Sequence, residues 1–350
     1  MTRYGKTTMR VAMWYHNRDV RVEEMPVPEI GAGDLLVRVE ACGICGSDVM
    51  EWYRRDRAPL VLGHEIGGQV VAVGEGVEAY REGDRITAAH HVPCNTCHYC
   101  LRGNHTVCDL LRQTNFDPGG LAEYFRLSPI HVERGVFKLP ASVSYEEATF
   151  VEPLACVLRG QRLANMQPGS SVLVIGSGAV GLLHVKLALV QGASRVVATD
   201  IIDYRLKAAR RFGAEVALHA DGDLPSRLRE VNQGRLADLV IVSTGVKSAI
   251  EQALASVERG GTVLFFAPTA PGVTIPISIN EFFFRNDITL TTSYAGSPAD
   301  YQAALKLIAT GKVPVREMIS HRLSLAEAGL GFQIVAEARD SIKVIIEPQR

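Results

Sequence analysis

Four cysteines in one short stretch have a spacing that can hold a metal ion. They read Cys-x2-Cys-x2-Cys-x7-Cys, and four thiolates at such spacing can surround one tetrahedral Zn²⁺. These cysteines are Cys94, Cys97, Cys100 and Cys108. A site closed by four sulfurs has no open position for a substrate, so we expect a structural zinc. Disulfides, unrelated buried thiols and a redox Cys-x-x-Cys pair are alternatives, and the regular spacing of all four argues against them.

Three other segments carry side chains that could bind a second metal ion. They are ACGICGSD with Cys45 and Ser47, GHEIGG with His64 and Glu65, and VEPLAC with Glu152. Taken singly, a cysteine is usually part of a core, a histidine is usually a satisfied polar residue, and a glutamate before proline usually lies in a surface turn. Together they offer a thiolate, an imidazole and two carboxylates. Such a set could enclose zinc and leave one position for water or substrate.

The segment VLVIGSGAVG predicts a dinucleotide-binding turn. Gly176, Gly178 and Gly181 form Gly-x-Gly-x-x-Gly between an apolar strand and a helix, and the same turn contributes Ala179 and Val180. The first glycine permits a tight turn, the second lets the backbone approach a pyrophosphate, and the third lets the helix pack against the strand. The helix N-terminus then faces the phosphates. The motif alone leaves FAD or a mononucleotide open as the ligand.

An acidic residue follows these glycines at the distance expected for ribose recognition. Asp200 comes at the end of the next strand, about twenty residues on, where a carboxylate accepts hydrogen bonds from both ribose hydroxyls. It would also repel a 2'-phosphate, so we expect NAD rather than NADP. Arg205 lies close by in the sequence and could weaken this preference for NAD over NADP. A competing interpretation makes Asp200 the N-cap of a helix that begins near Asp203.

The elements that must position these residues fall into two regions. Residues 10–150 carry short alternating runs broken by Gly and Pro, such as Leu35–Glu40 and Gln69–Val73, which predict a β-rich region. Residues 170–290 alternate strand-sized and helix-sized runs, which predicts a parallel sheet covered on both faces. Those runs are Val172–Ile175, Val180–Val190, Val196–Thr199, Tyr204–Phe212, Asp238–Val242, Ala249–Val257 and Thr262–Phe266. Two helices and the apolar run Ile342–Ile346 follow, and this run could be a strand that returns to the first region.

Length, composition and charge favour a protein that acts on small molecules. A chain of 350 residues with 47% hydrophobic residues suits roughly two domains with large cores. The formal net charge of -1, without a run of Lys or Arg, argues against nucleic-acid or membrane partners. The N-terminal segment meets charged residues before any apolar run could act as a signal, and no apolar run is long enough to span a membrane. Seven cysteines, four of them in a metal pattern, fit a reducing compartment, so we expect a cytoplasmic location.

Taken together, these motifs resemble the zinc-dependent medium-chain dehydrogenases of the alcohol dehydrogenase superfamily, most closely the sorbitol (polyol) and threonine dehydrogenase branch. The resemblance covers nearly the whole chain, through GDLLVRVEACGICGSD, LGHEIGGQVVAVGEGVEAYREGDRI, the cysteine lobe, VEPLAC, GSGAVG and HRLSLAEA in that order. It implies an α/β protein with a GroES-like, β-rich catalytic domain (residues 1–157 and 295–350) that carries the zinc lobe at about 90–110. A Rossmann NAD-binding domain, a doubly wound parallel sheet, is inserted at residues 158–294.

The resemblance also implies roles for single residues. Cys45 and His64 match the ligands of the catalytic zinc. Glu65 matches a residue that binds zinc or swings toward it, and Glu152 matches one that completes the site or holds the zinc-bound water; the sequence does not rank the two. Ser47 matches the hydroxyl that receives the substrate proton. Asp48 falls where the family keeps a carboxylate that orients the ligand histidine.

The implied activity is the reversible, NAD-dependent oxidation of a secondary alcohol, either a polyol, a cyclitol or a sugar-like compound, to the ketone. Two zinc ions per chain and a homo-oligomer, a tetramer rather than a dimer, are expected, with Val273–Ile279 as a segment that could pair across subunits. The alternatives are a threonine 3-dehydrogenase-like or general alcohol/aldehyde dehydrogenase, a zinc-free quinone or enoyl reductase, and a zinc-lobe binding module without catalysis. The zinc-free reductase would not need the cysteines and His64 that this chain carries.

Two positions depart from the polyol pattern. Met50 stands where the family commonly has a histidine that passes the proton outward, so we expect the relay to run through Glu51 or ordered water. Ser293 stands where sorbitol dehydrogenases carry an arginine that grips polyol hydroxyls, although Tyr294 is kept. The second departure leaves the identity of the alcohol open.

Overall fold

The computed structural model describes residues 7–350 and divides them into two compact units. One unit contains the chain up to Ala155 together with Ala295–Arg350, and the other contains Cys156–Tyr294. The sequence predicts that the N-terminal segment is not a signal peptide, and residues 1–6 of that segment lie outside the described residues. Within residues 7–350, none of the helices has the length and apolar character needed to cross a membrane.

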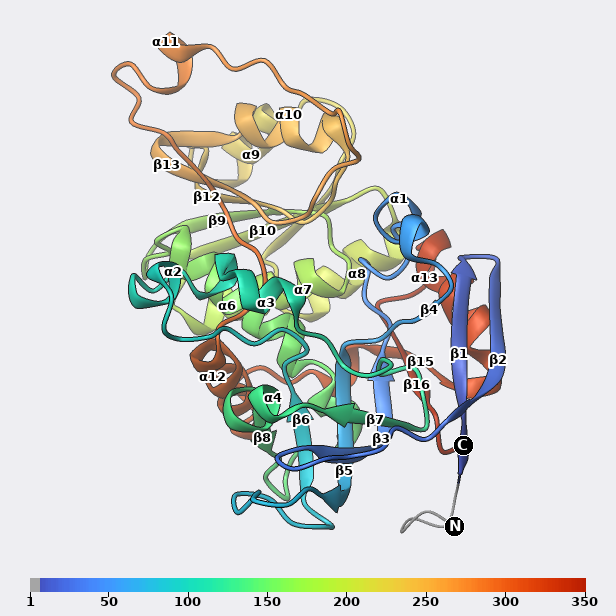
Figure 1. The fold of residues 1–350 in the computed structure, drawn as a ribbon. Helices are drawn as coiled ribbons and strands as arrows, with labels where there is room; N and C mark the ends of the chain where they lie inside the picture. The colour runs from blue at the N-terminus through green and yellow to red at the C-terminus, as the bar shows by residue number, and fades with distance from the viewer. Residues whose placement is uncertain (1–6) are drawn as a thin grey trace. The chain divides into compact units, whose positions relative to one another are not determined.

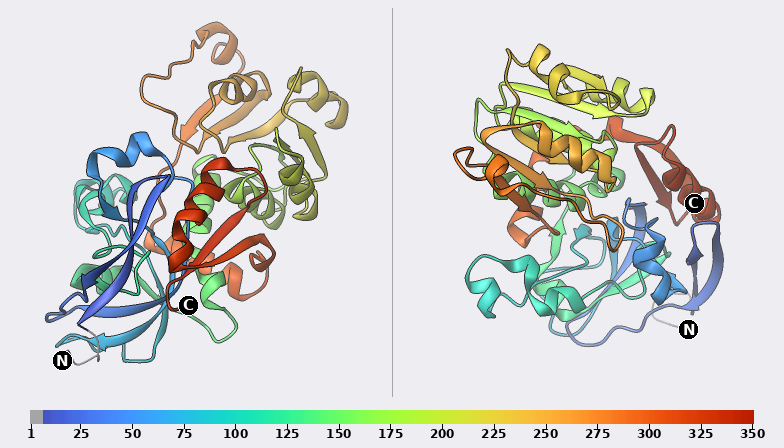
Figure 2. Two further views of the ribbon diagram at one scale, coloured as in Figure 1. Left: turned by 90° about the vertical axis from the view of Figure 1, so that its right-hand side faces the viewer. Right: turned by 90° about the horizontal axis from the view of Figure 1, so that it is seen from above.

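The main sheet of the first unit joins strands from both ends of the chain. Its order is β15-β16-β3-β5-β6-β8, and β7 pairs with β3 on the side. The strands are β3 (Leu35–Gly43), β5 (Glu65–Val73), β6 (Arg85–Ala88), β7 (Tyr124–Leu127), β8 (Val136–Lys138), β15 (Ile319–Ser324) and β16 (Lys343–Glu347). Because β16 pairs antiparallel with β3, the C-terminal apolar run does return to the N-terminal region, as the red and blue strands of Figures 1 and 2 show.

A smaller sheet and a set of short helices complete this unit. The order of the small sheet is β2-β1-β4, and buried side chains such as Trp14, Leu35, Phe125 and Phe332 form one core with the main sheet. The strands are β1 (Thr8–His16), β2 (Asp19–Pro26) and β4 (Leu60–Val61). The helices are α1 (Glu51–Arg54), α2 (His98–Leu101), α3 (Asp109–Gln113), α4 (Pro129–Arg134), α5 (Tyr145–Ala148), α12 (Pro298–Ala309), α13 (Ala328–Glu337) and the 3-10 turns Arg55–Arg57, His105–Val107, Arg316–Met318 and Leu325–Glu327. Helix α6 (Val151–Leu163) continues into the second unit.

The second unit is a six-stranded parallel sheet in the order β11-β10-β9-β12-β13-β14. Its strands are β9 (Ser171–Ile175), β10 (Arg195–Asp200), β11 (Val216–His219), β12 (Ala237–Val242), β13 (Val257–Phe265) and β14 (Thr289–Thr292). Its helices are α7 (Ala179–Val190), α8 (Asp203–Arg211), α9 (Leu224–Val231), α10 (Lys247–Ala255) and α11 (Ile279–Phe282). Figure 1 shows α9 and α10 on one face of the sheet and α7 and α8 on the other. Central β9 is buried along its whole length, as a strand covered on both faces must be.

This strand order is that of a doubly wound fold, so the predicted α/β architecture is confirmed. The order reverses beside β9, and the turn that follows this strand carries the glycine motif. One predicted helix, Ala249–Val257, is too long by two residues, because Val257 already begins β13. Strands β11 and β14, which have four residues each, were not among the predicted elements.

Candidate active site

The four lobe cysteines converge in the first unit. One sulfur from each of them lies within 4.8 Å of the others. The Sγ atoms of Cys94 and Cys100 are 3.9 Å apart, close to the edge of about 3.8 Å that a tetrahedron with Zn–S bonds of about 2.3 Å requires. The turns at Asn95 and Gly103, both with positive φ, fold the backbone back around the sulfurs. This donor set fits a structural zinc ion.

Backbone amides of the lobe point at its sulfurs. The N–H of Cys97 donates to Cys94 Sγ at 3.2 Å, and the N–H of Cys94 donates to Cys108 Sγ at 3.4 Å. Hydrogen bonds from the backbone N–H groups of Thr96 and Cys97 lower the pKa of the Cys94 thiol to about 5. Such amides stabilise thiolates, the form in which cysteine binds a metal.

Three groups in the first unit form a second cluster of potential ligands. Donor atoms of Cys45, His64 and Glu65 all lie within 4.8 Å of one another. Cys45 follows β3, whereas His64 directly precedes β5, the antiparallel neighbour of β3, and Glu65 is its first residue. The pairing of these two strands therefore brings together residues that are twenty positions apart. A thiolate, an imidazole and a carboxylate make a fitting set for a catalytic zinc with an open position.

A buried carboxylate orients the histidine of this cluster. Asp48, with no exposed surface, lies 3.4 Å from His64 Nδ1 and accepts a 3.0 Å hydrogen bond from the N–H of Cys45. Burial opposes ionisation of Asp48, but His64, Arg54 and this N–H outweigh it and lower the pKa of the carboxyl. With Nδ1 engaged, His64 presents Nε2 to a metal. Burial would lower the pKa of His64, but Asp48 and Cys45 outweigh it and raise this pKa well above the ordinary value. A metal ion binds the neutral imidazole, so it would have to displace a proton from His64.

Ser47 lies between this cluster and an arginine. Its Oγ donates to Cys45 Sγ at 3.4 Å and accepts from Arg54 Nη2 at 3.3 Å, and Arg54 Nε donates to the Ser47 carbonyl at 3.3 Å. Arg54 ends α1 and is also 3.4 Å from Asp48 Oδ1. An arginine keeps its proton at all working pH values, so Arg54 can hold Ser47 in place but cannot carry a proton away.

Glu51, one of the two predicted relay routes, has other partners. One carboxylate oxygen accepts from the N–H of Asn17 at 3.0 Å and the other from Arg55 Nη2 at 2.8 Å. The first of these bonds is the main reason why the pKa of Glu51 is lowered. A carboxyl group with a lowered pKa accepts protons poorly near neutral pH, so these contacts favour water over Glu51 as the outward route.

A buried lysine competes for Glu65. Lys343, which is 3% exposed on β16, donates from Nζ to Glu65 Oε2 at 2.5 Å. Burial alone would lower the pKa of Lys343, but Glu65, Cys45 and Glu152 outweigh it and raise it. Glu152 is also buried, yet it is not in the group that Cys45, His64 and Glu65 form within 4.8 Å. The geometry thus favours Glu65 over Glu152 as the third ligand.

The glycine turn of the second unit has the backbone that a pyrophosphate site requires. Gly176 has φ of +93°, and its N–H donates to the carbonyl of Thr199 at 2.9 Å. A Cβ on Gly181 would lie 1.9 Å from the Gly176 carbonyl oxygen, so only glycine permits this helix to pack so close. Gly178 is the N-cap of α7, which begins with Ala179 and Val180. The first turn of this helix offers free N–H groups to an anion.

Asp200 and Arg205 flank this turn. Asp200, at the end of β10, accepts from the N–H of Ser177 at 2.8 Å and from that of Ile202 at 3.0 Å. These bonds fix the carboxylate and leave it lone pairs for further donors. Asp200 does not cap α8, whose N-cap is Ile202. The Arg205 guanidinium lies 3.9 Å from where a Gly178 Cβ would stand, and its buried Nε has no partner within the described chain.

Three residues of this region were not among the predicted site residues. They are Lys343, Arg54 and His90, whose ring lies against that of His64 with centroids 4.6 Å apart. A lysine inside the apolar run Ile342–Ile346 was a usable signal, since a lysine in a buried strand requires a partner. The adjacent pair of histidines before the lobe was a weaker signal. Nothing in the sequence around Arg54 indicates its contacts with Ser47 and Asp48.

Comparison with known proteins identifies the class to which this fold and these clusters belong. Residues 31–141 match the alcohol dehydrogenase GroES-like domain, and residues 179–310 match the zinc-binding dehydrogenase family. The sorbitol dehydrogenase of Gallus gallus is 30% identical, with 94% of this chain and 93% of that protein covered. The D-xylulose reductase A of Aspergillus oryzae is 32% identical, with 93% of each covered.

A solved structure agrees with these relatives. A zinc-binding dehydrogenase from Sinorhizobium meliloti 1021 bound to NADP has a TM-score of 0.87 and 30% identity, with 98% of this chain and 100% of that chain covered. The chain belongs to the zinc-dependent medium-chain dehydrogenases, in their polyol dehydrogenase branch. It is therefore an oxidoreductase.

Proposed function

We propose that this enzyme oxidises a secondary alcohol of the polyol, cyclitol or sugar-like class to the ketone, reversibly and with NAD. The observation that carries the proposal is the Cys45, His64 and Glu65 cluster with Ser47 hydrogen-bonded to Cys45. The relatives named for sorbitol and xylulose support the substrate class. We assign catalysis to residues 1–157 and 295–350 and cofactor binding to residues 158–294.

In this proposal each residue has a separate task. When bound, the zinc ion supplies a Lewis acid and the nicotinamide supplies a hydride acceptor. Cys45, His64 and Glu65 hold the metal, and Asp48 keeps His64 in the correct tautomer. Ser47 accepts the proton of the substrate hydroxyl and passes its own proton to water.

A screen of polyols, cyclitols and simple alcohols for NADH formation tests the activity. Turnover of at least one secondary alcohol is expected, and a zinc chelator should abolish it. Metal analysis should find about two zinc ions per chain, one for each cluster. The proposal is refuted when the zinc-loaded protein oxidises none of these alcohols and reduces none of the matching ketones.

Ser47→Ala is expected to lower kcat by about 10²- to 10³-fold, since a positioned proton acceptor typically contributes this much. Ser47→Thr keeps the hydroxyl and should retain most of the activity. Met50→His adds a titratable ring next to Glu51, so turnover at low pH should rise if the outward relay limits the rate and should stay unchanged if water already carries the proton. Steady-state kinetics across pH measure both effects. Normal turnover of Ser47→Ala at every pH would rule out this proton path.

Asp200→Ser is expected to narrow the preference for NAD over NADP by at least about tenfold, because the buried carboxylate opposes a 2'-phosphate. The pairing of Asp200 with two backbone N–H groups supports this role. Asp203→Ser, an exposed position at the start of α8, is the matched control and should leave the preference unchanged. The ratio of kcat/KM for the two cofactors gives the result. Equal use of NAD and NADP by the unaltered enzyme would contradict the role given to Asp200.

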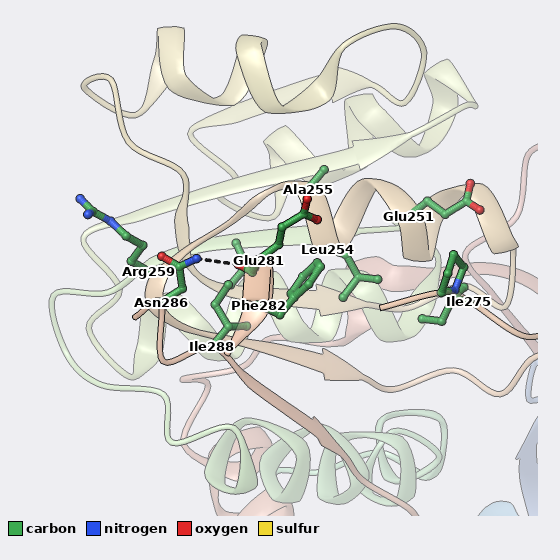
Figure 3. A pocket seen from close by; sticks show the side chains of 11 residues that line it. Glu251, Leu254, Ala255, Arg259, Ile275, Glu281, Phe282, Asn286 and Ile288 are labelled. Carbon is green, nitrogen blue, oxygen red and sulfur yellow. Dashed lines mark hydrogen bonds between the residues drawn. The ribbon is translucent and has the colours of Figure 1, made fainter. Parts of the chain in front are cut away.

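We propose a homo-oligomer, a tetramer rather than a dimer, built on the β14 edge of the six-stranded sheet. Strand β14 has no outer neighbour within the described chain, and Ile279 and Phe284, in the segment that leads to β14, are each 67% exposed. In the predicted segment Val273–Ile279, residues 273–278 form a loop rather than a strand, and Ile279 begins α11. Behind α11 lies a pocket of about 440 Å³, where Figure 3 shows Phe282 close to Leu254 and Ile288.

An exposed sheet edge with apolar neighbours is a site for a second copy of the chain. Light scattering should give a mass of four chains. Phe284→Lys, which puts a charge on this surface, should lower the mass, and a monomeric wild type would exclude the interface.

We infer a reducing, cytoplasmic compartment. All seven cysteines are free of disulfides, and four of them converge as metal ligands do. Cell fractionation tests the location.

A further inference from the structure

A polar atom without a partner lies beside the Cys45, His64 and Glu65 cluster. His90 follows β6, and its ring packs on that of His64 at a centroid distance of 4.6 Å and an interplanar angle of 42°. The Nδ1 atom of His90 is buried and has no hydrogen-bond partner within residues 7–350. A buried nitrogen without a partner is unfavourable, so such atoms normally meet a water or a ligand.

The backbone around His90 is firmly held. Its carbonyl accepts from His131 Nε2 at 3.0 Å, and His131 Nδ1 in turn accepts from Ser128 Oγ at 2.8 Å. The neighbouring His91 donates from Nδ1 to the carbonyl of Thr114 at 2.6 Å. His131 and His91 thus use ring nitrogens in structural hydrogen bonds, whereas Nδ1 of His90 makes none within the described chain. The backbone contact fixes the position of His90 next to His64, and its Nδ1 can therefore bind a ligand there.

His90 is suited to a hydroxyl group. Its buried Nδ1 has no hydrogen-bond partner within residues 7–350, and its ring packs on that of His64. A neutral imidazole has one donor and one acceptor nitrogen. A hydroxyl group also donates and accepts, and therefore matches it better than a carboxylate or phosphate, which only accepts at neutral pH.

Arg54 adds a donor on the same part of the site. Two of its nitrogens hold Ser47 and Asp48 at 3.3–3.4 Å, and Asp48 in turn lies 3.4 Å from His64 Nδ1. Its third nitrogen, Nη1, donates to no acceptor in the described part of the chain. The buried carboxylate of Asp48 offsets the positive charge of Arg54, so this donor also favours a neutral hydroxyl over an anion.

We propose that His90 and Arg54 form a subsite for a second hydroxyl of the substrate, on the carbon next to the one that is oxidised. The subsite makes the enzyme prefer a vicinal diol to a simple secondary alcohol. It rests on the proposed function and adds the residues that select the substrate.

The test compares 2,3-butanediol with 2-butanol, which differ by the one hydroxyl in question. Wild type should prefer the diol in kcat/KM. His90→Phe keeps a ring on His64 but removes the nitrogens, and should lower the diol-to-alcohol ratio about tenfold, the loss of one hydrogen bond. His90→Asn carries an amide near the Nδ1 position and should restore most of the ratio. His90→Gln reaches the Nε2 position instead and should behave like His90→Phe. Zinc content and thermal unfolding are measured for each variant.

Some results would overturn the subsite. Equal losses on both compounds would mean that His90 acts on the metal site or the fold, and a wild-type preference for lactate would mean that the subsite takes an anion. If wild type oxidises neither of these two compounds, saturation-transfer NMR of the diol with the zinc-loaded protein tests the subsite alone, and the proposed function is decided by the wider screen of alcohols. A signal that is weaker in His90→Phe than in wild type would support it, and equal signals would refute it. Should His90→Phe not fold, the contrast between His90→Asn and His90→Gln gives the same decision.

Discussion

Cys45→Ala is expected to reduce kcat about 10³-fold or more while leaving the fold and one zinc ion in place. The thiolate of Cys45 is one of three converging ligands, and its removal leaves only His64 and Glu65, of which Glu65 is also bound by Lys343. His64 and Glu65 alone should bind the metal ion too weakly to retain it. A Lewis acid lowers such a barrier by several kcal/mol, and a loss of about 4 kcal/mol corresponds to about 10³ in rate.

Cys97→Ala is the matched control, because it removes one sulfur from the lobe and none from the proposed catalytic cluster. It should lower the melting temperature and release the other zinc ion, with a smaller effect on kcat in protein that remains folded. Metal analysis, circular dichroism and steady-state kinetics on both variants measure these outcomes. Full activity in Cys45→Ala, or loss of both zinc ions in it, would show that the two clusters do not have these separate roles.

Much of the fold was predictable because its signals are local. The alternation of apolar runs with helix-length segments indicated the parallel sheet, and the glycines after β9 indicated the cofactor turn. Strand β14 was missed for a physical reason. Its residues, Thr289–Thr292, are partly exposed at the sheet edge and lack the apolar run that marks a buried strand.

The candidate site was predictable only in part. The cysteine lobe lies within fifteen residues of sequence, so its spacing alone indicates convergence. The meeting of Cys45 with His64 requires the antiparallel pairing of β3 and β5, which the sequence indicated through family resemblance rather than through geometry. The contact of Lys343 with Glu65 joins residues 278 positions apart, and no local pattern encodes such a contact.

Lys343→Met is expected to destabilise the metal-free protein by about 3–5 kcal/mol, because it leaves the carboxylate of Glu65 buried without its partner. Both side chains are at most 3% exposed, so water cannot replace the ammonium group. Zinc would supply a compensating charge to the same carboxylate. The loss should therefore be smaller in the zinc-loaded protein, and by the thermodynamic cycle the variant should bind its catalytic zinc more tightly than wild type.

Urea unfolding with and without zinc measures this difference, and competition with a chelator measures the zinc affinity. Lys138→Met is the matched control: Lys138 pairs with Asp84 at 2.8 Å but is 53% exposed, so its loss should cost less than about 1 kcal/mol and should not depend on zinc. Adding Glu65→Gln to Lys343→Met should recover part of the stability, since the uncompensated charge disappears. Equal destabilisation with and without zinc would show that Glu65 pairs with Lys343 and does not bind zinc. Glu152 would then have to be the third ligand.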